Sequence, residues 1–220
     1  MAELTTSVQD GPERAYAAYA VVDSLSLASI HEANVSFLGV LGDSEHSGAR
    51  LAALGIDALV ASRVRALEPT ARHALAACPY ALFDVQFGNA RVWREFVLGS
   101  DAAAAQATHE HAAFARTAVF LAWHLAQSND LAASLVLGMT AEVQRLWRGM
   151  PVSMLEPAAR AAAPRLAARW GRHRTFWPKL LDSAAPGGRA QAEAVRLLGL
   201  QLIAADGAWP PAGGAGGGAR

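Results

Sequence analysis

Arginine and aromatic side chains alternate within residues 165–177, and this stretch of the chain is the one best suited to bind an anion. Its cationic members are Arg165, Arg169, Arg172 and Arg174, and its aromatic members are Trp170, Phe176 and Trp177. Guanidinium groups bind phosphates, and aromatic faces stack on bases or support the guanidinium groups. Contact with nucleic acid is therefore one interpretation. The alternatives are pairing with acidic residues of the same chain and contact with a protein partner.

The charges of the chain are distributed unevenly, although nineteen basic residues balance nineteen acidic ones. Residues 1–110 contain seven Arg or Lys and thirteen Asp or Glu, whereas residues 143–179 contain eight basic residues and Glu156 alone. Such asymmetry indicates either two surfaces with different partners or two halves that attract each other.

Histidine and cysteine side chains do not form a recognisable catalytic or metal-binding pattern. His109 and His111 are two positions apart and point to different sides of a helix, and with His124 they do not match a zinc-binding spacing. Cys78 is the single cysteine and is expected to pack as a small apolar residue. Phosphate-binding glycine loops and nucleophile motifs are absent from the sequence. We therefore expect no enzymatic activity, no metal, no cofactor and no small-molecule substrate.

Four residues near the end of the first expected helix, 12–41, share one helical face: Ile30, Asn34, Phe37 and Leu38. In one interpretation this face packs in the core, where Asn34 needs hydrogen-bond partners. In the other it is a seam with a second copy or a partner protein, where an asparagine fixes the register.

Composition predicts an all-α fold, because alanine dominates an apolar fraction of 53% and favours helices over strands. Asp57 and Thr140 are expected to cap helices, Pro69 to begin one, and Gly55 and Gly138 to end one. Residues 80–87 form the one stretch with the alternation of a strand. The first ten residues lack the basic residues of a signal peptide, and the apolar runs are too short to span a bilayer. We expect a cytoplasmic protein.

The two halves of the chain resemble each other at a constant offset of 83 residues. The matching pairs include Phe37 and Phe120, Gly55 and Gly138, Val60 and Val143, Phe87 and Trp170, Gly88 and Gly171, and Trp93 and Phe176. A second local match, between residues 67–72 and 155–160, has an offset of 88 and indicates an insertion or a coincidence. Two similar small helical units that bury each other's apolar faces are expected, so that one chain imitates a two-fold dimer.

The expected domain organisation follows from this duplication. A flexible arm spans residues 1–11, the first helical unit spans 12–105, and the second spans 106–206. The tail at 207–220 is rich in Gly and Pro and is expected to be disordered.

Residues 30–38, which read Ile-His-Glu-Ala-Asn-Val-Ser-Phe-Leu, resemble the opening helix of the FlhD family. Leu-Gly-Ile-Asp at 54–57, Pro69, and Leu-Phe-Asp-Val-Gln-Phe at 82–87 follow in the order of that family. The resemblance covers residues 25–95, and the second half shares it only weakly. The chain departs from the family by being about twice as long. Phe83 stands about where some members have an intersubunit cysteine, so the resemblance implies no such disulfide for this chain.

Members of the FlhD family are small, all-α, dimeric transcription regulators that act with a partner, FlhC, on promoters of flagellar genes. The partner carries a cysteine zinc site and makes most of the DNA contact. The resemblance therefore implies an FlhD-like regulator that works through an FlhC-like subunit, self-association or both, and binds DNA jointly with that partner. The alternative is a stand-alone helical adaptor or modulator with no direct role on DNA.

Overall fold

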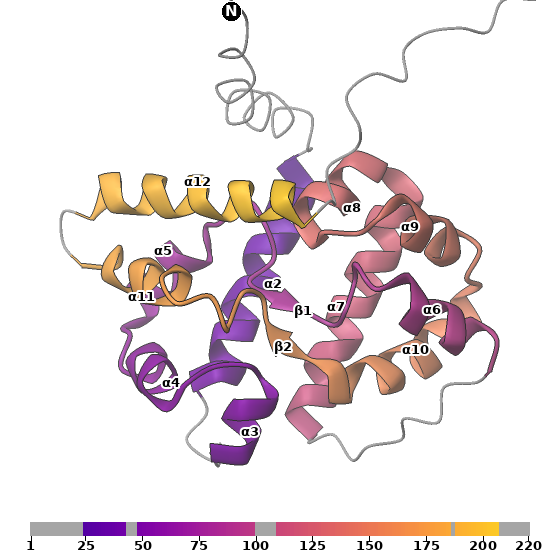
Figure 1. Cartoon of the computed structure of the whole chain (residues 1–220), viewed down its shortest axis with the longest axis horizontal. Coiled ribbons are helices and arrows are strands. Elements are labelled where there is room, and N and C mark those ends of the chain that lie inside the picture. The colour runs from indigo at the N-terminus through magenta and orange to yellow at the C-terminus, as the bar shows by residue number, and fades with distance from the viewer. Residues whose placement is uncertain (1–23, 43–47, 100–108, 186–187, 207–220) are drawn as a thin grey trace, which may run out of the picture.

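Alanine-rich segments between glycines, prolines and capping residues form helices throughout the part of the chain that the computed structural model describes, residues 24–42, 48–99, 109–185 and 188–206 (Figure 1). Within these residues the fold is all-α apart from one two-stranded sheet. The expected arm at 1–11, the start of the first helix at 12–23 and the tail at 207–220 lie outside the described residues.

The first half contains α2 (Ser24–Gly42), α3 (Gly48–Ala53), α4 (Ala58–Arg65), α5 (Pro69–Ala76), β1 (Phe83–Asp84) and α6 (Ala90–Val97). Asp57 caps α4 as predicted, because its carboxylate accepts a hydrogen bond from the backbone N–H of Val60 at 2.8 Å. Pro69 is the first residue of α5, where its missing N–H costs nothing. Asn89 caps α6 through a bond from the N–H of Val92.

The second half contains α7 (His109–Ser128), α8 (Asp130–Leu137), α9 (Ala141–Arg148), η1 (Val152–Met154), α10 (Leu155–Ala162), η2 (Ala163–Arg165), β2 (Ala167–Ala168), α11 (Phe176–Asp182) and α12 (Arg189–Ala205). Thr140 caps α9 as predicted, through a bond from the N–H of Val143 at 3.3 Å. Gly138 ends α8 with φ of +74°, a conformation that favours glycine.

The order of elements in the second half repeats the order in the first. A shift of 83 residues carries α4 onto α9 and Gly55, with φ of +72°, onto Gly138. The shift is 84 residues at the turns after the strands, where Gln86 and Trp170 both adopt positive φ. The second half has η1 before α10 and a shorter connection from α10 to β2, so the local offset changes along the chain.

Four pairs predicted from the 83-residue offset are wrong in detail. Phe37 is fully buried in α2, but Phe120 on α7 is 41% exposed, and α7 instead places Phe114 against Phe37. Residues 43–47 lie between α2 and α3, whereas Asn129 alone separates α7 from α8, so the first helices follow another offset. At the turns, the positive φ pairs Trp170 with Gln86 and not with Phe87. The same 84-residue shift relates Gly88 to Arg172 and Trp93 to Trp177, so Gly171 and Phe176 are not their counterparts.

The two halves meet in the short antiparallel sheet, in which Phe83 pairs with Ala168 and Asp84 with Ala167 (Figure 1). The predicted extended segment 80–87 contains β1. Its partner β2 is an Ala-Ala pair that has no strand pattern of its own, so only the tertiary fold makes it extended.

Beyond the sheet, one helix of each half packs on a helix of the other half. Helix α6 packs on α9, where the rings of Trp93 and Trp147 lie 4.6 Å apart. Helix α11 packs on α4, where the Arg63 guanidinium pairs with the Asp182 carboxylate at 2.7 Å. The two units are therefore not separate bodies in contact, because each is completed by a helix from the other.

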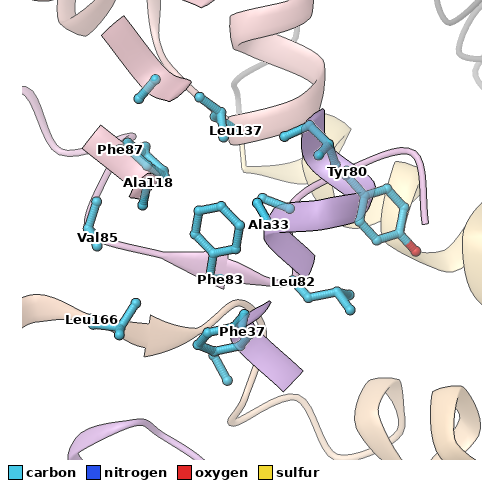
Figure 2. Close-up of a cluster of buried hydrophobic side chains, with 14 of the residues drawn as sticks. Ala33, Phe37, Tyr80, Leu82, Phe83, Val85, Phe87, Ala118, Leu137 and Leu166 are labelled. Atoms are coloured by element: carbon cyan, nitrogen blue, oxygen red, sulfur yellow. The ribbon is translucent and has the colours of Figure 1, made fainter. Parts of the chain in front are cut away.

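One hydrophobic core runs through both halves. At its centre Phe83 of β1 contacts Phe37 of α2 and Phe114 of α7, with ring centroids 5.8 and 4.9 Å apart. Figure 2 shows Phe83 beside Phe37, surrounded by side chains that include Ala118, Leu137 and Leu166 of the second half.

Helix α12 has no counterpart among the described residues of the first half, and it packs on α11 (Figure 1). The Tyr80 hydroxyl donates to the backbone carbonyl of Val195 at 3.1 Å. A Cβ at Gly199 would collide with the Tyr80 ring, so a glycine is required for this close approach.

Candidate functional site

The four residues of the expected seam lie inside the molecule. Ile30, Asn34, Phe37 and Leu38 are each 0% exposed, and their helix α2 packs on α4, α5 and α7 of the same chain. A contact of these side chains with a second chain would require the core to open. The structure thus places this face between helices of one chain.

Asn34 has three hydrogen bonds in this core. Its Nδ2 donates to the carbonyls of Ala76 at 3.2 Å and Tyr80 at 2.9 Å, and its Oδ1 accepts from the N–H of Leu82 at 2.8 Å. Ala76 is the last residue of α5, and Tyr80 and Leu82 lie in the connection between α5 and β1. Asn34 therefore holds the segment that leads into the sheet and satisfies backbone groups that burial would leave unpaired.

The four arginines of the basic-aromatic stretch fall into two structural classes. Arg165 is half-buried and donates to the carbonyl of Ala161, and Arg169 is only 7% exposed. Arg172 and Arg174 are exposed. The sequence predicted one anion-binding set, and the structure does not bring its four members to one surface.

Arg169 is engaged in the interior. Its Nη1 donates to the carbonyl of Val136 at 2.8 Å, and its guanidinium carbon lies 4.6 Å from the centroid of the Trp170 ring. Burial raises the pKa of the Asp84 carboxyl, while the N–H of Phe87 and the charge of Arg169 act in the opposite direction. The side chain of Arg169 thus binds within its own half, and its backbone N–H donates across the halves to the carbonyl of Leu82 at 2.8 Å.

Two clefts lie at equivalent places beside the sheet, one for each turn that follows a strand. The basic cleft, of about 520 Å³, is lined by Ala52, Gly55, Ile56, Asp57, Val60, Gly171, Arg172, His173, Arg174, Trp177 and Pro178. The acidic cleft, of about 590 Å³, is lined by Asp84, Gln86, Gly88, Asn89, Ala90, Leu137, Gly138, Thr140, Ala167, Ala168, Arg169, Trp170 and Asp206.

The repeat relates these two clefts residue by residue. Gly55 and Asp57 of the basic cleft correspond to Gly138 and Thr140 of the acidic cleft. In the turns, a shift of 84 residues relates Gly88-Asn89-Ala90 to Arg172-His173-Arg174. The two turns have the same place in the repeat, but residues 88–90 are uncharged whereas residues 172–174 include two arginines.

His173 has the structural role of Asn89 in addition to its place in the basic cleft. Its Nδ1 accepts a hydrogen bond from the N–H of Phe176 at 3.2 Å, as Asn89 accepts from Val92. Because Nδ1 is an acceptor, the neutral ring carries its proton on Nε2, which is then a donor. His173 thus adds a hydrogen-bond donor to the cleft beside the two arginines.

The remaining titratable candidates lie apart from these clefts. His109 and His124 are exposed on α7, and His111 is buried on the same helix. Among the described residues, no group of three or more His, Cys, Asp or Glu side chains is arranged to hold a metal ion. Cys78 is buried and donates to the carbonyl of Leu75. No helix in the described part of the chain is both long enough and apolar enough to cross a membrane.

Comparisons with known protein families, with characterised proteins and with solved structures find no match to this chain.

Sequence reasoning missed the acidic cleft and the walls of the basic one. A partial signal was present, because the 83-residue offset pairs Gly88 with Gly171, one position out of the register of the turns, and each of these glycines lines one of the clefts. Placing them opposite the helix-ending glycines of the other half required the exchange of α6 and α11, which no local pattern encodes.

Proposed function

We propose that this protein is a single-chain, FlhD-like transcription regulator, in which two halves of one chain take the place of two subunits. It acts through an FlhC-like partner subunit on flagellar promoters. The proposal combines the resemblance of residues 30–38, 54–57 and 82–87 to the FlhD family with the architecture of the molecule.

The observation that carries the proposal is that each half packs one of its helices on the other half in the same way. Helix α6 of the first half packs on α9, α11 of the second half packs on α4, and β1 pairs with β2 between them. In a two-fold dimer a surface of one subunit meets the same surface of the other. This chain has that relation within itself, which supports its descent from a dimeric regulator by duplication.

The arrangement also supports a monomeric state for the isolated chain. The seam residues Ile30, Asn34, Phe37 and Leu38 are used inside the molecule, so the contact that would join two subunits is already made. Light scattering of the purified protein is expected to give the mass of one chain.

Co-purification tests the regulatory role. The full chain is mixed with the FlhC-like zinc protein of the same genome, and the complex is isolated by size exclusion. We expect a stable complex that binds flagellar promoter DNA more tightly than either protein alone. In parallel, deletion of the gene is expected to lower flagellar transcripts, and its return in trans to restore them.

The two experiments separate the regulator from a helical adaptor. Unchanged flagellar transcripts in the deletion strain, together with the absence of a complex, would refute the proposal. A complex that forms without any gain in promoter binding would favour the adaptor, because the contact between the two proteins would then not increase DNA binding.

A further inference from the structure

We propose that the basic cleft between α4 and α11 binds the phosphate backbone of duplex DNA, and that the related acidic cleft does not. The inference rests on the proposed function for the choice of DNA as the polyanion. It adds the surface involved and the asymmetry between the halves.

The cationic groups of the basic cleft are available to a ligand. Arg172 and Arg174 are exposed, and neither forms an ion pair with another of the described residues. His173, between them, has its Nδ1 engaged with the N–H of Phe176. Two full positive charges and an imidazole donor therefore line one opening, which is the chemistry that phosphate oxygens require.

The acidic groups near this cleft are already occupied. Asp57 lines the cleft, but its carboxylate caps α4 by accepting from the N–H of Val60. Asp182 on α11 pairs with Arg63 of α4 at 2.7 Å. Neither carboxylate pairs with Arg172 or Arg174, so the positive potential of the turn is not cancelled by a direct ion pair.

The acidic cleft is an internal comparison with nearly the same backbone. Gly88 and Ala90 stand where the basic cleft has Arg172 and Arg174, and Asp84 and Asp206 line its walls. The one arginine there, Arg169, is bonded to the carbonyl of Val136 and stacked on Trp170. A phosphate would meet carboxylates and no available cation, so this cleft disfavours a polyanion.

Charge at equivalent positions thus differs between the halves while the framework is kept. A symmetric dimer presents every DNA contact twice, whereas this chain presents this one only once. Contacts to phosphate supply affinity and orientation without reading the base sequence. The basic cleft is therefore expected to orient the protein on DNA.

Fluorescence anisotropy of a labelled 30-base-pair duplex, titrated with the full chain between 50 and 300 mM salt, tests this inference. The variant R172Q/R174Q is compared with R145Q/R160Q, which removes the same charge from exposed residues outside the cleft. For R172Q/R174Q we expect a weaker salt dependence, in which the negative slope of log affinity against log salt concentration becomes smaller in magnitude by about 2. We also expect the affinity at 100 mM salt to fall by about tenfold or more. The control is expected to change the affinity by less than about threefold.

A third variant, R172K/R174K, keeps the charge and is expected to restore most of the affinity, since a phosphate contact of this kind is mainly electrostatic. Circular dichroism checks that all variants are folded. Equal losses in R172Q/R174Q and R145Q/R160Q would overturn the inference, as would no binding by the unmodified chain at 50 mM salt. Tighter binding to an RNA hairpin than to the DNA duplex would overturn the assignment to DNA.

The result is independent of the partner experiment. If the chain binds duplex DNA through Arg172 and Arg174 but forms no complex with the FlhC-like subunit, and its deletion leaves flagellar transcripts unchanged, the proposed function is refuted and the assignment of the basic cleft stands. If the chain forms the complex but R172Q/R174Q leaves its DNA affinity unchanged, the assignment of the basic cleft is refuted and the proposed function stands.

Discussion

Gly171 packs backbone to backbone against Gly55, and a Cβ at position 171 would collide with the carbonyl oxygen of Gly55. In the other half, Gly88, one position further along the turn, meets the carbonyl of Gly138 less closely, with 3.3 Å between that oxygen and a Cβ at position 88. These two contacts mark the places where each turn crosses into the other half. A glycine at position 171 is therefore required for the second half to pack this closely on the first.

Gly171→Ala is expected to lower the free energy of unfolding by about 1–3 kcal/mol, because the methyl group has to push two backbone segments apart. Gly88→Ala is expected to cost less than about 1 kcal/mol, since the neighbouring atom lies at 3.3 Å. Urea unfolding measures both. Gly39→Ala in α2 is the control, because a Cβ there meets no atom within 4 Å, and it should stabilise by about 0.5–1 kcal/mol. Equal losses at 171 and 39 would contradict the close contact.

Asn34→Ala is expected to lower the free energy of unfolding by about 2–4 kcal/mol. The change removes three hydrogen bonds and leaves the N–H of Leu82 and the carbonyls of Ala76 and Tyr80 without these partners in the core. Ser36→Ala, at an exposed position of the same helix, should change stability by less than about 0.5 kcal/mol. Chemical denaturation compares the two, and similar small effects would show that Asn34 does not hold the α5–β1 connection.

Phe37→Ala and Phe120→Ala separate the structure from the simple 83-residue repeat. The Phe37 ring is fully buried against Phe83 and Phe114, so its loss should cost about 3–5 kcal/mol. Phe120 is 41% exposed, and its truncation should cost less than about 1.5 kcal/mol. Equal costs, measured by urea unfolding, would mean that the two rings occupy equivalent core sites after all.

Cys78 is expected to be unreactive in the folded protein. Burial raises the pKa of its thiol from 9.0 to about 12, so very little thiolate exists at pH 8. Labelling with a chromogenic disulfide at pH 8 should be at least about 1,000-fold slower than in urea-unfolded protein. Because the folded pKa lies above the unfolded value, Cys78 favours folding fully below pH 9 and loses this contribution as the pH rises towards 12. Fast labelling without denaturant would contradict its burial.

Asp84→Asn is expected to change how stability depends on pH. Burial raises the pKa of the Asp84 carboxyl above 3.8 in the folded state. The carboxyl therefore favours folding fully below pH 3.8, and this contribution is lost as the pH rises and the buried group ionises. Urea unfolding from about pH 3.5 to about pH 7 should show a flatter dependence of stability on pH for Asp84→Asn than for the unmodified chain. Identical dependences of stability on pH in the two proteins would show that ionisation of Asp84 does not destabilise the folded state.

The sequence by itself determined the local structure of this protein. Alanine between punctuating residues predicted the helices, and Asp57, Pro69 and Thr140 stand at helix starts because caps and first-turn prolines depend on neighbours only a few residues away. The repeated Gly55 and Gly138 were visible for the same reason, since a left-handed residue after a helix is a local requirement. An all-α fold with an internal repeat followed from such signals.

Only the tertiary structure decided which surfaces the residues occupy. Arg169 and Arg172 belong to one basic stretch of the sequence, but Arg169 is buried between the halves while Arg172 lines an open cleft. Phe37 and Phe120 match in the sequence and differ in burial, because the connections that follow their helices differ in length. The pairing of β2 with β1 and the packing of α6 on α9 and of α11 on α4 join residues that are far apart in the sequence, such as Arg63 and Asp182. Their energy comes from burying one shared core, which a local pattern does not encode.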